Sequence, residues 1–562
     1  MKRHGFWMGI GIGLIIIIPI TALMALASVV LKVDFLPFNL FDWLARVLPG
    51  NVITFGIDQM VRVISLFNLG ATDSVAKLAE QVMSIVGFIG LNALIGGLFF
   101  LLAKRVPSIQ RHAVVAGMIL GVLCATLTLM VATNTPQYGQ VNYLLSILVQ
   151  GILMFVFGLI LGIFYRTLDS LETTLRPESR TFEAYNRRQF LIGTGTGAAV
   201  ITLVGAGLST LIARNISSDS GVPTPMPTGL VGSETSVPTQ VAELPNADDP
   251  LVPAPGTRPE YTPLDQHYRI DINLIPPFVA EEGYTLPFVT SIVSGDGTQT
   301  TLAQLTLDQI RNDFEAVSDY ITMACISNPI GGDLISTTLW TGARMRDILE
   351  SVGIPEGATH LFISAADGFF EAVSIEEIMS DERIILCYAW DQQPLTTEHG
   401  FPLRIHLPNR FGMKQPKWIT QIEFVAGDRD GYWVVRGWDK EAIAVSASVI
   451  DTIAIDAAYE NEQGQWFIPI GGMAWAGDRG ISDVQIRVDD GEWVSAQLRT
   501  PLSERAWTIW RYDWPYTEGN HRFTVRCREG DGDAQPEFRA NPHPAGAAGL
   551  YAVDRAIPAF NA

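Results

Sequence analysis

The sequence predicts a multi-domain protein in which an all-α membrane region precedes a mixed α+β domain and an all-β sandwich. Three observations predict this order. Long apolar stretches crowd the first 212 residues, helical and strand patterns alternate between about 258 and 430, and strand patterns dominate from there to the C-terminus. A chain of 562 residues has room for three or four domains.

Charge divides the chain at the same place. The composition is 48% hydrophobic with a mean hydropathy of +0.23, which is high for a soluble protein. Residues 1–212 carry 14 Lys and Arg against 9 Asp and Glu, a net charge of +5. Because the whole chain carries −20, the remaining residues carry −25. So acidic a region cannot neutralise phosphates in bulk, which argues against nucleic acid as a partner.

Five apolar stretches are long enough to cross a bilayer, which takes about 20 residues. They are residues 6–31, 82–103, 113–132, 143–165 and 190–212. Lysine and arginine gather on the side of the N-terminus, so the positive-inside rule predicts a cytoplasmic N-terminus. Everything after about residue 213 is then extracytoplasmic. His4 and His112 lie near cytoplasmic ends, which disfavours a bis-histidine haem, so we interpret the region 1–212 as an anchor and partner-docking unit.

A paired arginine precedes the last apolar stretch. Arg187 and Arg188 are followed by Phe190-Leu191 and a Gly-rich hydrophobic segment. The motif at 186–192 resembles a twin-arginine translocation signal, which exports proteins that are already folded. The alternative interpretation is two further cytoplasmic flanking charges.

Three regions follow the membrane part. Residues 213–257 are rich in Pro, Ser, Thr and Gly and predict a disordered linker. Residues 258–430 alternate short β-branched and aromatic runs with helical segments, which predicts an α+β domain. Residues 431–562 show strand runs spaced by turn signals such as DDG and EGN, which predicts an immunoglobulin-like sandwich.

The four cysteines lie far apart and form no CxxC motif, which excludes a sequence-local zinc, iron–sulfur or covalent haem site. Cys325 ends an apolar run and is followed by Asn328 and a Gly-Gly pair. A cysteine at the transition from strand to loop can present its sulfur to a soft metal. The alternative is an ordinary core cysteine.

Five ordered blocks resemble the sulfite oxidase family over about residues 258–562. The block around Cys325 continues through Asn328 to a Trp-x-Gly at 340–342, and upstream TPLDQHYRIDINLIPP gives Arg269 and Asn273. The remaining blocks are ADGFFEAVSIEEI (366–378), HGFPLRIHLPNRFGMKQPKWITQIEF (399–424), and GGMAWAGDRGISDVQIRVDDGEW (471–493) with PAGAAGLY (544–551).

The resemblance implies a molybdenum-molybdopterin cofactor and a homodimer formed through the immunoglobulin-like domain. It implies Cys325 as the catalytic metal ligand and Arg269 as a catalytic cation near the metal. The cofactor-binding residues it implies are Asn273, Asn328, His399, Arg404, Gly412, Lys414 and Lys417. Positive charge is concentrated within nineteen residues by His399, Arg404, Lys414 and Lys417, which suits a cofactor that carries a phosphate.

The sequence departs from the family at two places. Pro329-Ile330 stand where an arginine is usual, and Phe369-Phe370 occupy the region of an active-site tyrosine. We predict a membrane-anchored, extracytoplasmic molybdenum-pterin oxidoreductase that transfers an oxygen atom to or from a small oxyanion, with sulfite a candidate. A separate carrier, a cytochrome or a membrane partner, would exchange the electrons. The alternatives are a reductase of S-oxides on the same scaffold and a non-catalytic surface protein that has kept the fold.

Overall fold

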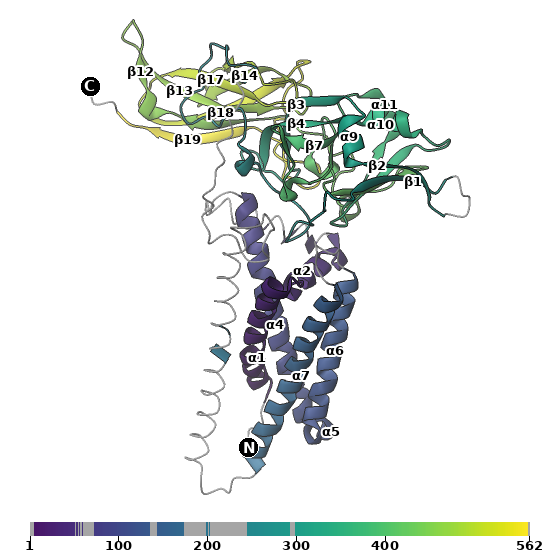
Figure 1. Ribbon diagram of the computed structural model, residues 1–562. Helices are drawn as coiled ribbons and strands as arrows, with labels where there is room; N and C mark the ends of the chain where they lie inside the picture. Colours follow the sequence, from purple (N-terminus) through teal and green to yellow (C-terminus); the bar gives the residue numbers. More distant parts are fainter. Residues whose placement is uncertain are drawn as a thin grey trace. The chain divides into compact units, whose positions relative to one another are not determined.

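The computed structural model describes residues 5–50, 72–134, 143–173, 244–292 and 298–559, with isolated positions at 52–53, 55–56, 59, 198–199 and 202. The chain divides into two compact units, which we describe separately (Figure 1). The helical unit comprises residues 1–48, 76–232 and 271–278. The β-rich unit comprises residues 49–75, 233–270 and 279–562.

The described helices of the first region are α1 (Phe6–Leu31), α2 (Leu36–Val47), α4 (Thr72–Arg105), α5 (Pro107–Arg111), α6 (Ala113–Thr133) and α7 (Tyr143–Thr173). Judged by length and composition, four described segments could cross a membrane: Phe6–Leu31, Val75–Arg105, Ala113–Thr133 and Tyr143–Ser170. With 12 residues, α2 is too short to do so. The predicted fifth stretch at 190–212, apart from three positions, and the paired arginines at 186–192 lie outside the described residues.

Glycines bring α6 and α7 into close contact. A Cβ atom at Gly117 would lie 2.5 Å from the carbonyl oxygen of Gly158 and 2.8 Å from Cα of Gly162. Gly121, one turn along α6, meets the backbone of Phe155 in the same way. Small residues four apart are the usual means by which membrane helices pack at short range.

The α+β part of the β-rich unit contains two sheets. One has the order β2 (Thr300–Thr306), β1 (Thr285–Thr290), β10 (Ile419–Val425), β5 (His360–Ala365) and β6 (Phe370–Ser374), with β1 and β10 parallel. The other has the order β3 (Ala316–Ala324), β4 (Ile335–Arg344), β7 (Ile385–Trp390) and β8 (Gln393–Pro394), and β9 (Arg404–His406) also pairs with β7. The helices α9 (Leu307–Asn312), α10 (Met345–Val352) and α11 (Ile375–Ser380) contribute Ile310, Ile348 and Ile378 to the core beneath these strands.

The C-terminal part is a sandwich of two antiparallel sheets. One has the order β11 (Ala447–Ile453), β13 (Trp466–Trp475), β17 (Thr508–Pro515) and β16 (Gln497–Leu498), with β12 (Tyr459–Glu460) on β13. The other has the order β15 (Val494–Ser495), β14 (Ile481–Val488), β18 (Gly519–Glu529) and β19 (Tyr551–Ile557). Trp510 and Ile470 of the first sheet share one buried core with Phe523 and Val484 of the second, so the sheets pack face to face.

The end of the predicted linker differs from the expectation of disorder. The Arg499 guanidinium donates to the carbonyl oxygens of Asn246 and Leu251 at 2.9 and 2.8 Å, and Arg258 pairs with Asp451 at 2.6 Å. Residues 244–257 therefore lie against the sandwich. Apolar residues are sparse in this segment, but polar partners supplied by distant strands order its backbone.

Candidate functional site

Cys325 lies where β3 ends and a short loop leads into β4. Its N–H donates a hydrogen bond of 3.0 Å to the carbonyl oxygen of Leu334 across the loop. Asn328 closes the same loop, because its N–H donates to the Cys325 carbonyl and its Oδ1 accepts the Leu334 N–H, both at 3.0 Å. The loop thus holds the cysteine in place, and Asn328 determines the shape of the loop.

The surroundings of the Cys325 thiol suit a single protein ligand to a metal. Burial raises the pKa of the thiol, and the Ser327 hydroxyl, 3.0 Å from Sγ, acts in the opposite direction. A metal binds the thiolate, so coordination would release the proton. Across the part of the chain that the structure describes, no group of three or more His, Cys, Asp or Glu could hold a metal ion. Cys325 therefore fits a metal whose other ligands come from a cofactor.

Cys325 packs against a buried cluster that includes Tyr268, Trp340 and Trp390. The His267 ring lies in the same place, 5.6 Å from the Trp340 ring and 5.2 Å from the His399 ring. Nε2 of His267 and Nε1 of both tryptophans are buried and have no hydrogen-bond partner among the described residues. Buried polar atoms almost always have partners. These three fit a polar ring system such as a pterin.

Arg404 places an unbalanced positive charge in this cluster. The side chain is 5% exposed, and its guanidinium lies 4.7 Å from the centre of the Trp340 ring. It donates to the His399 carbonyl oxygen at 3.2 Å and approaches Met323 Sδ at 3.6 Å, and it forms no ion pair with any described carboxylate. Burial lowers the pKa of the Arg404 guanidinium, because loss of solvent disfavours its charged form. A buried cation without a counter-ion is costly, so this position fits an anionic group.

Positive charges also surround His399. Burial holds the pKa of this histidine well below its usual value, so the ring is neutral at pH 7. Neighbouring groups lower the pKa further, namely His267, Lys417, Arg404 and Arg269. The structure thus brings Arg269 within electrostatic reach of His399.

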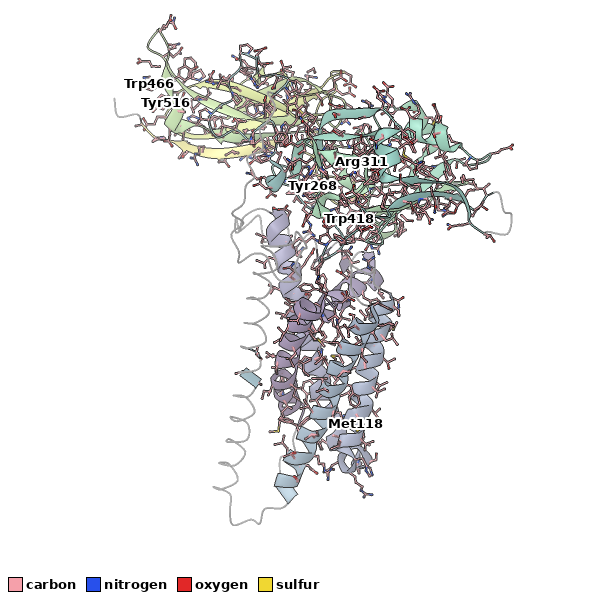
Figure 2. All side chains as sticks on the ribbon, viewed as in Figure 1. Met118, Tyr268, Arg311, Trp418, Trp466 and Tyr516 are labelled. Carbon is pink, nitrogen blue, oxygen red and sulfur yellow. The ribbon has the colours of Figure 1, made fainter. Side chains whose placement is uncertain are left out.

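Two further predicted residues lie beside these groups. Lys417 donates to the Glu398 carbonyl oxygen at 3.1 Å and covers the Trp418 ring at 4.3 Å. A Cβ atom at Gly412 would lie 3.1 Å from the hydroxyl of Tyr268, so this glycine permits a close approach. Tyr268 and Trp418, both labelled in Figure 2, belong to this part of the β-rich unit.

Lys414, which was predicted to bind the cofactor, forms an ion pair with a buried acid. Its Nζ is 2.6 Å from Oε1 of Glu371, whose side chain is fully buried. Burial raises the pKa of Glu371, and the lysine charge opposes that shift. Lys414 therefore neutralises a buried carboxylate of β6. The sequence places this lysine close to the other cations but does not reveal that a strand from elsewhere supplies an acid for it.

Asn273, which was also predicted to bind the cofactor, contacts a helix of the helical unit. It is fully buried in the helical unit, where its Oδ1 accepts a hydrogen bond of 2.6 Å from Arg46 of α2. Asn273 is thus grouped with the apolar helices, whereas Arg269 belongs to the β-rich unit. Spacing within one segment could not show that the segment passes from one unit to the other.

Sequence reasoning did not single out His267, Tyr268 or Trp390. The first two directly precede the predicted Arg269, so their position next to it could have indicated that they belong to the site. Trp390 ends the apolar strand β7 and carries no comparable signal. Tyr268 bears on the missing active-site tyrosine, because it is electrostatically coupled to Cys325 and Arg404, and burial raises its pKa. A buried phenol therefore lies near the cysteine although Phe369 and Phe370 follow the Asp-Gly pair.

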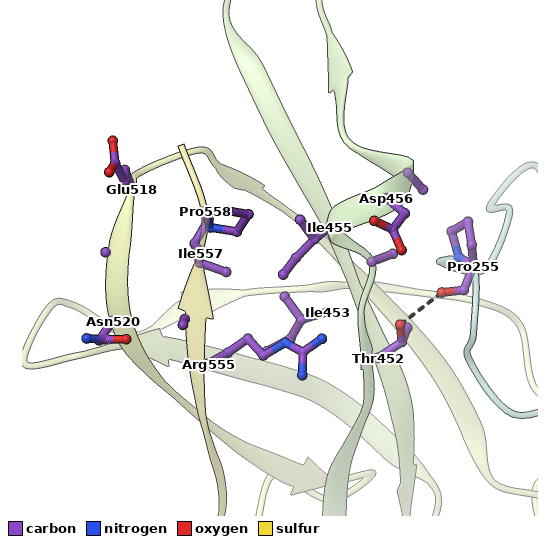
Figure 3. A pocket seen from close by; sticks show the side chains of 14 residues that line it. Pro255, Thr452, Ile453, Ile455, Asp456, Glu518, Asn520, Arg555, Ile557 and Pro558 are labelled. Carbon is purple, nitrogen blue, oxygen red and sulfur yellow. Dashed lines mark hydrogen bonds between the residues drawn. The ribbon is translucent and has the colours of Figure 1, made fainter. Parts of the chain in front are cut away.

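A pocket of about 820 Å³ lies elsewhere, at one end of the sandwich (Figure 3). Ile453, Ile455 and Ile557 line it together with the charged Asp456, Glu518 and Arg555. None of its lining residues belongs to the predicted site, and it contains no cysteine. The pocket is therefore separate from the cysteine cluster.

Residues 290–433 match the family model described as the oxidoreductase molybdopterin binding domain. This range contains Cys325, His399, Arg404 and Lys417, whereas Arg269 precedes it. Residues 290–433 are thus similar to a domain that binds molybdopterin in oxidoreductases, and the cysteine cluster fits such a cofactor.

Several curated proteins share part of this sequence. Mitochondrial sulfite oxidase of Macaca fascicularis is 25% identical over 362 residues, which cover 52% of this chain and 66% of that protein. An NADH nitrate reductase of Hordeum vulgare is 28% identical over 193 residues, which cover 30% of this chain and 20% of that protein. The uncharacterized oxidoreductase YuiH of Bacillus subtilis (strain 168) is 34% identical over 100 residues, which cover 18% of this chain and 50% of that protein. The chain spans less than two thirds of the length of each of these relatives.

One solved structure matches with a TM-score of 0.44 and 16% identity, covering 60% of this chain and 100% of its own. It is the sulfane dehydrogenase SoxCD from Paracoccus pantotrophus. At this TM-score the likeness carries no argument, so the assignment depends on the family model, the curated relatives and the site.

Acid is expected to destabilise the fold through its buried histidines. Burial lowers the pKa of His406 to about 3. Below about pH 6.5 the unfolded chain binds a proton that the folded chain does not, so the free energy of unfolding falls by about 1.4 kcal/mol per pH unit until about pH 3. Between pH 7 and 4.5, His406→Gln should therefore lose about 2–3 kcal/mol less than the wild type. Urea titration of the full chain in detergent measures this, and equal losses would show that His406 is protonated in the folded state.

A substitution at Gly342 tests whether close packing of β4 against β7 holds Trp340 in place. A Cβ atom at Gly342 would lie 2.5 Å from the Leu386 carbonyl oxygen and 2.8 Å from Cα of Cys387. Because both contacts are backbone, Gly342→Ala should separate β4 from β7 and cost about 1–3 kcal/mol of stability. Thermal unfolding should show a lower Tm, and metal analysis should show less molybdenum per chain. Gly87→Ala in α4, where the added methyl group meets open space, is the control and should change neither.

Proposed function

We propose that the chain is a membrane-anchored, extracytoplasmic oxidoreductase that transfers an oxygen atom at a molybdenum held by Cys325. The observation that carries this proposal is the buried Arg404, a cation without a carboxylate partner in the described chain. It lies in the same cluster of rings as the cysteine. A thiol that can bind molybdenum, at Cys325, and a cation without a described carboxylate partner, at Arg404, therefore lie in the same cluster.

Each residue then has a defined task. Cys325 supplies the thiolate, and Asn328 holds the loop that presents it. His399, Arg404 and Lys417 bind the anionic and polar parts of the cofactor, and Gly412 leaves room for it. Arg269 attracts an anionic substrate and stabilises negative charge that develops during the reaction. When bound, the molybdenum pterin supplies the redox chemistry, and the protein supplies orientation and electrostatics.

We propose sulfite as the first candidate substrate, because several of the similar proteins are named sulfite oxidase. One sulfite and one water would give one sulfate, two protons and two electrons, and the electrons would pass to a separate carrier. The reductive direction is the second candidate. The absence of an arginine at Pro329-Ile330, together with the relative named nitrate reductase, favours it.

The membrane part and the sandwich complete the proposal. The apolar helices anchor the chain, and the paired arginines direct export of the folded, cofactor-loaded part. The sandwich serves as an immunoglobulin-like dimerisation domain. The charge distribution of the sequence supports an extracytoplasmic position for the β-rich unit.

Two assays on the full chain test the function. The protein is produced with molybdenum, purified in detergent and analysed for the metal. Sulfite-dependent reduction of an artificial electron acceptor supports the oxidative direction, and substrate-dependent oxidation of reduced viologen supports the reductive one. A correctly folded chain that takes up no molybdenum would contradict both and favour a non-catalytic surface protein.

A further inference from the structure

The first turn of α4 is bonded to two of the chain segments that reach the cysteine cluster. The Thr72 N–H donates a hydrogen bond of 2.7 Å to Oδ2 of Asp333. Oδ2 of Asp73 accepts a hydrogen bond of 2.8 Å from the Arg269 N–H. Asp333 lies in the Cys325 loop, next to the Leu334 carbonyl that accepts the Cys325 N–H. The helix therefore begins on the loop that carries the proposed metal ligand.

These contacts suit a helix N-terminus. The first N–H groups of a helix have no partner within it, and carboxylates are favourable there. Asp333 satisfies one such N–H from another part of the chain, and Thr72 is only 8% exposed. The same helix, with 34 residues, contains the candidate membrane span Val75–Arg105.

One turn further along, α4 also holds the continuation of the Arg269 segment within the helical unit. Lys77 Nζ donates to the carbonyl oxygens of Asp271 and Asn273, both at 2.9 Å, and lies 3.2 Å from Asp271 Oδ1. Arg46 adds the bond to the Asn273 side chain. Residues 269–273 are thus fixed at several points by α4 and α2.

We infer that α4 is a positioning element of the redox site, in which Asp73 fixes Arg269 and, with it, the neighbouring Tyr268 near Cys325. This inference rests on the proposed function. Thr72, Asp73, Arg269 and Asp333 all belong to the β-rich unit, so the first turn of α4 acts within that unit. The positive-inside prediction agrees, because it assigns the start of α4 and the β-rich unit to the same side of the membrane.

Three variants of the full chain in detergent test the inference. Asp73→Ala removes the acceptor for the Arg269 N–H. Asp73→Asn removes the charge but keeps an amide oxygen that can accept that hydrogen bond. Asp308→Ala removes an exposed aspartate from the first turn of α9, so it controls for the effect of charge on helix ends.

Two readouts are taken on each variant, namely hydrogen exchange of the peptide containing Arg269 and molybdenum per chain. Asp73→Ala is expected to exchange about tenfold faster, because one hydrogen bond to a charged group is lost, and to contain less molybdenum. Asp73→Asn should recover most of both, and Asp308→Ala should match the wild type. Unchanged exchange in Asp73→Ala, or faster exchange with unchanged molybdenum, would overturn the inference. A wild-type chain without molybdenum contradicts the proposed function instead, and the exchange readout alone then decides on the contact.

Discussion

Replacing Cys325 with alanine is expected to lower turnover by more than about 100-fold, beyond the loss typical when supporting groups around a metal are removed. The physical reason is the loss of the thiolate that completes the metal's coordination. Turnover by the molybdenum-containing full chain, with sulfite or reduced viologen, measures the effect.

The matched control is Cys387→Ala. Cys387 is fully buried in the same cluster, and burial raises the pKa of its thiol to about 12, so it is an inert thiol at neutral pH. This variant should lose some stability through the small cavity and keep its turnover. Full activity in Cys325→Ala would contradict the assignment of the metal ligand.

Replacement by methionine is expected to have different effects on the stability of the cofactor-free protein at Arg404 and at Lys414. Arg404→Met removes a buried cation that has no counter-ion, so the cofactor-free protein should be no less stable than the wild type. Its molybdenum content should fall, because the anionic part of the cofactor loses its partner. Lys414→Met leaves Glu371 buried without its partner and should cost about 3–5 kcal/mol of stability.

Urea titration of the cofactor-free full chain and metal analysis of the loaded chain measure the two effects. Lys440→Met is the control for charge alone, since Lys440 pairs with Asp428 at the surface, where such a pair is worth about 1 kcal/mol or less. Equal destabilisation by Arg404→Met and Lys414→Met would show that both lysine and arginine serve the fold.

The sequence was most informative where chemistry is local. Strand periodicity predicted the α+β part and the all-β part, and the apolar runs predicted α1, α6 and α7. Cys325 and Arg404 were singled out because they lie in blocks that resemble the sulfite oxidase family, and their roles stay predictions. The structure then groups Arg404 and His399 with rings that pack near Cys325.

Sequence reasoning was least informative where a partner comes from a distant segment. Nothing near Lys414 shows that Glu371 of β6 will neutralise it, and nothing near Asn273 shows that Arg46 of α2 will bind it. The ordered residues 244–257 are a similar case, since Arg499 of the sandwich supplies their hydrogen bonds. Long-range pairing of polar groups leaves no periodic pattern in a single sequence.

The most direct test of the central claim is the count of sulfur ligands at molybdenum. X-ray absorption at the molybdenum edge, on the full chain and on Cys325→Ser, provides this count. We expect one more sulfur ligand in the wild type than in the variant, because the Cys325 thiolate binds the metal. The same number of sulfur ligands in both proteins would contradict it.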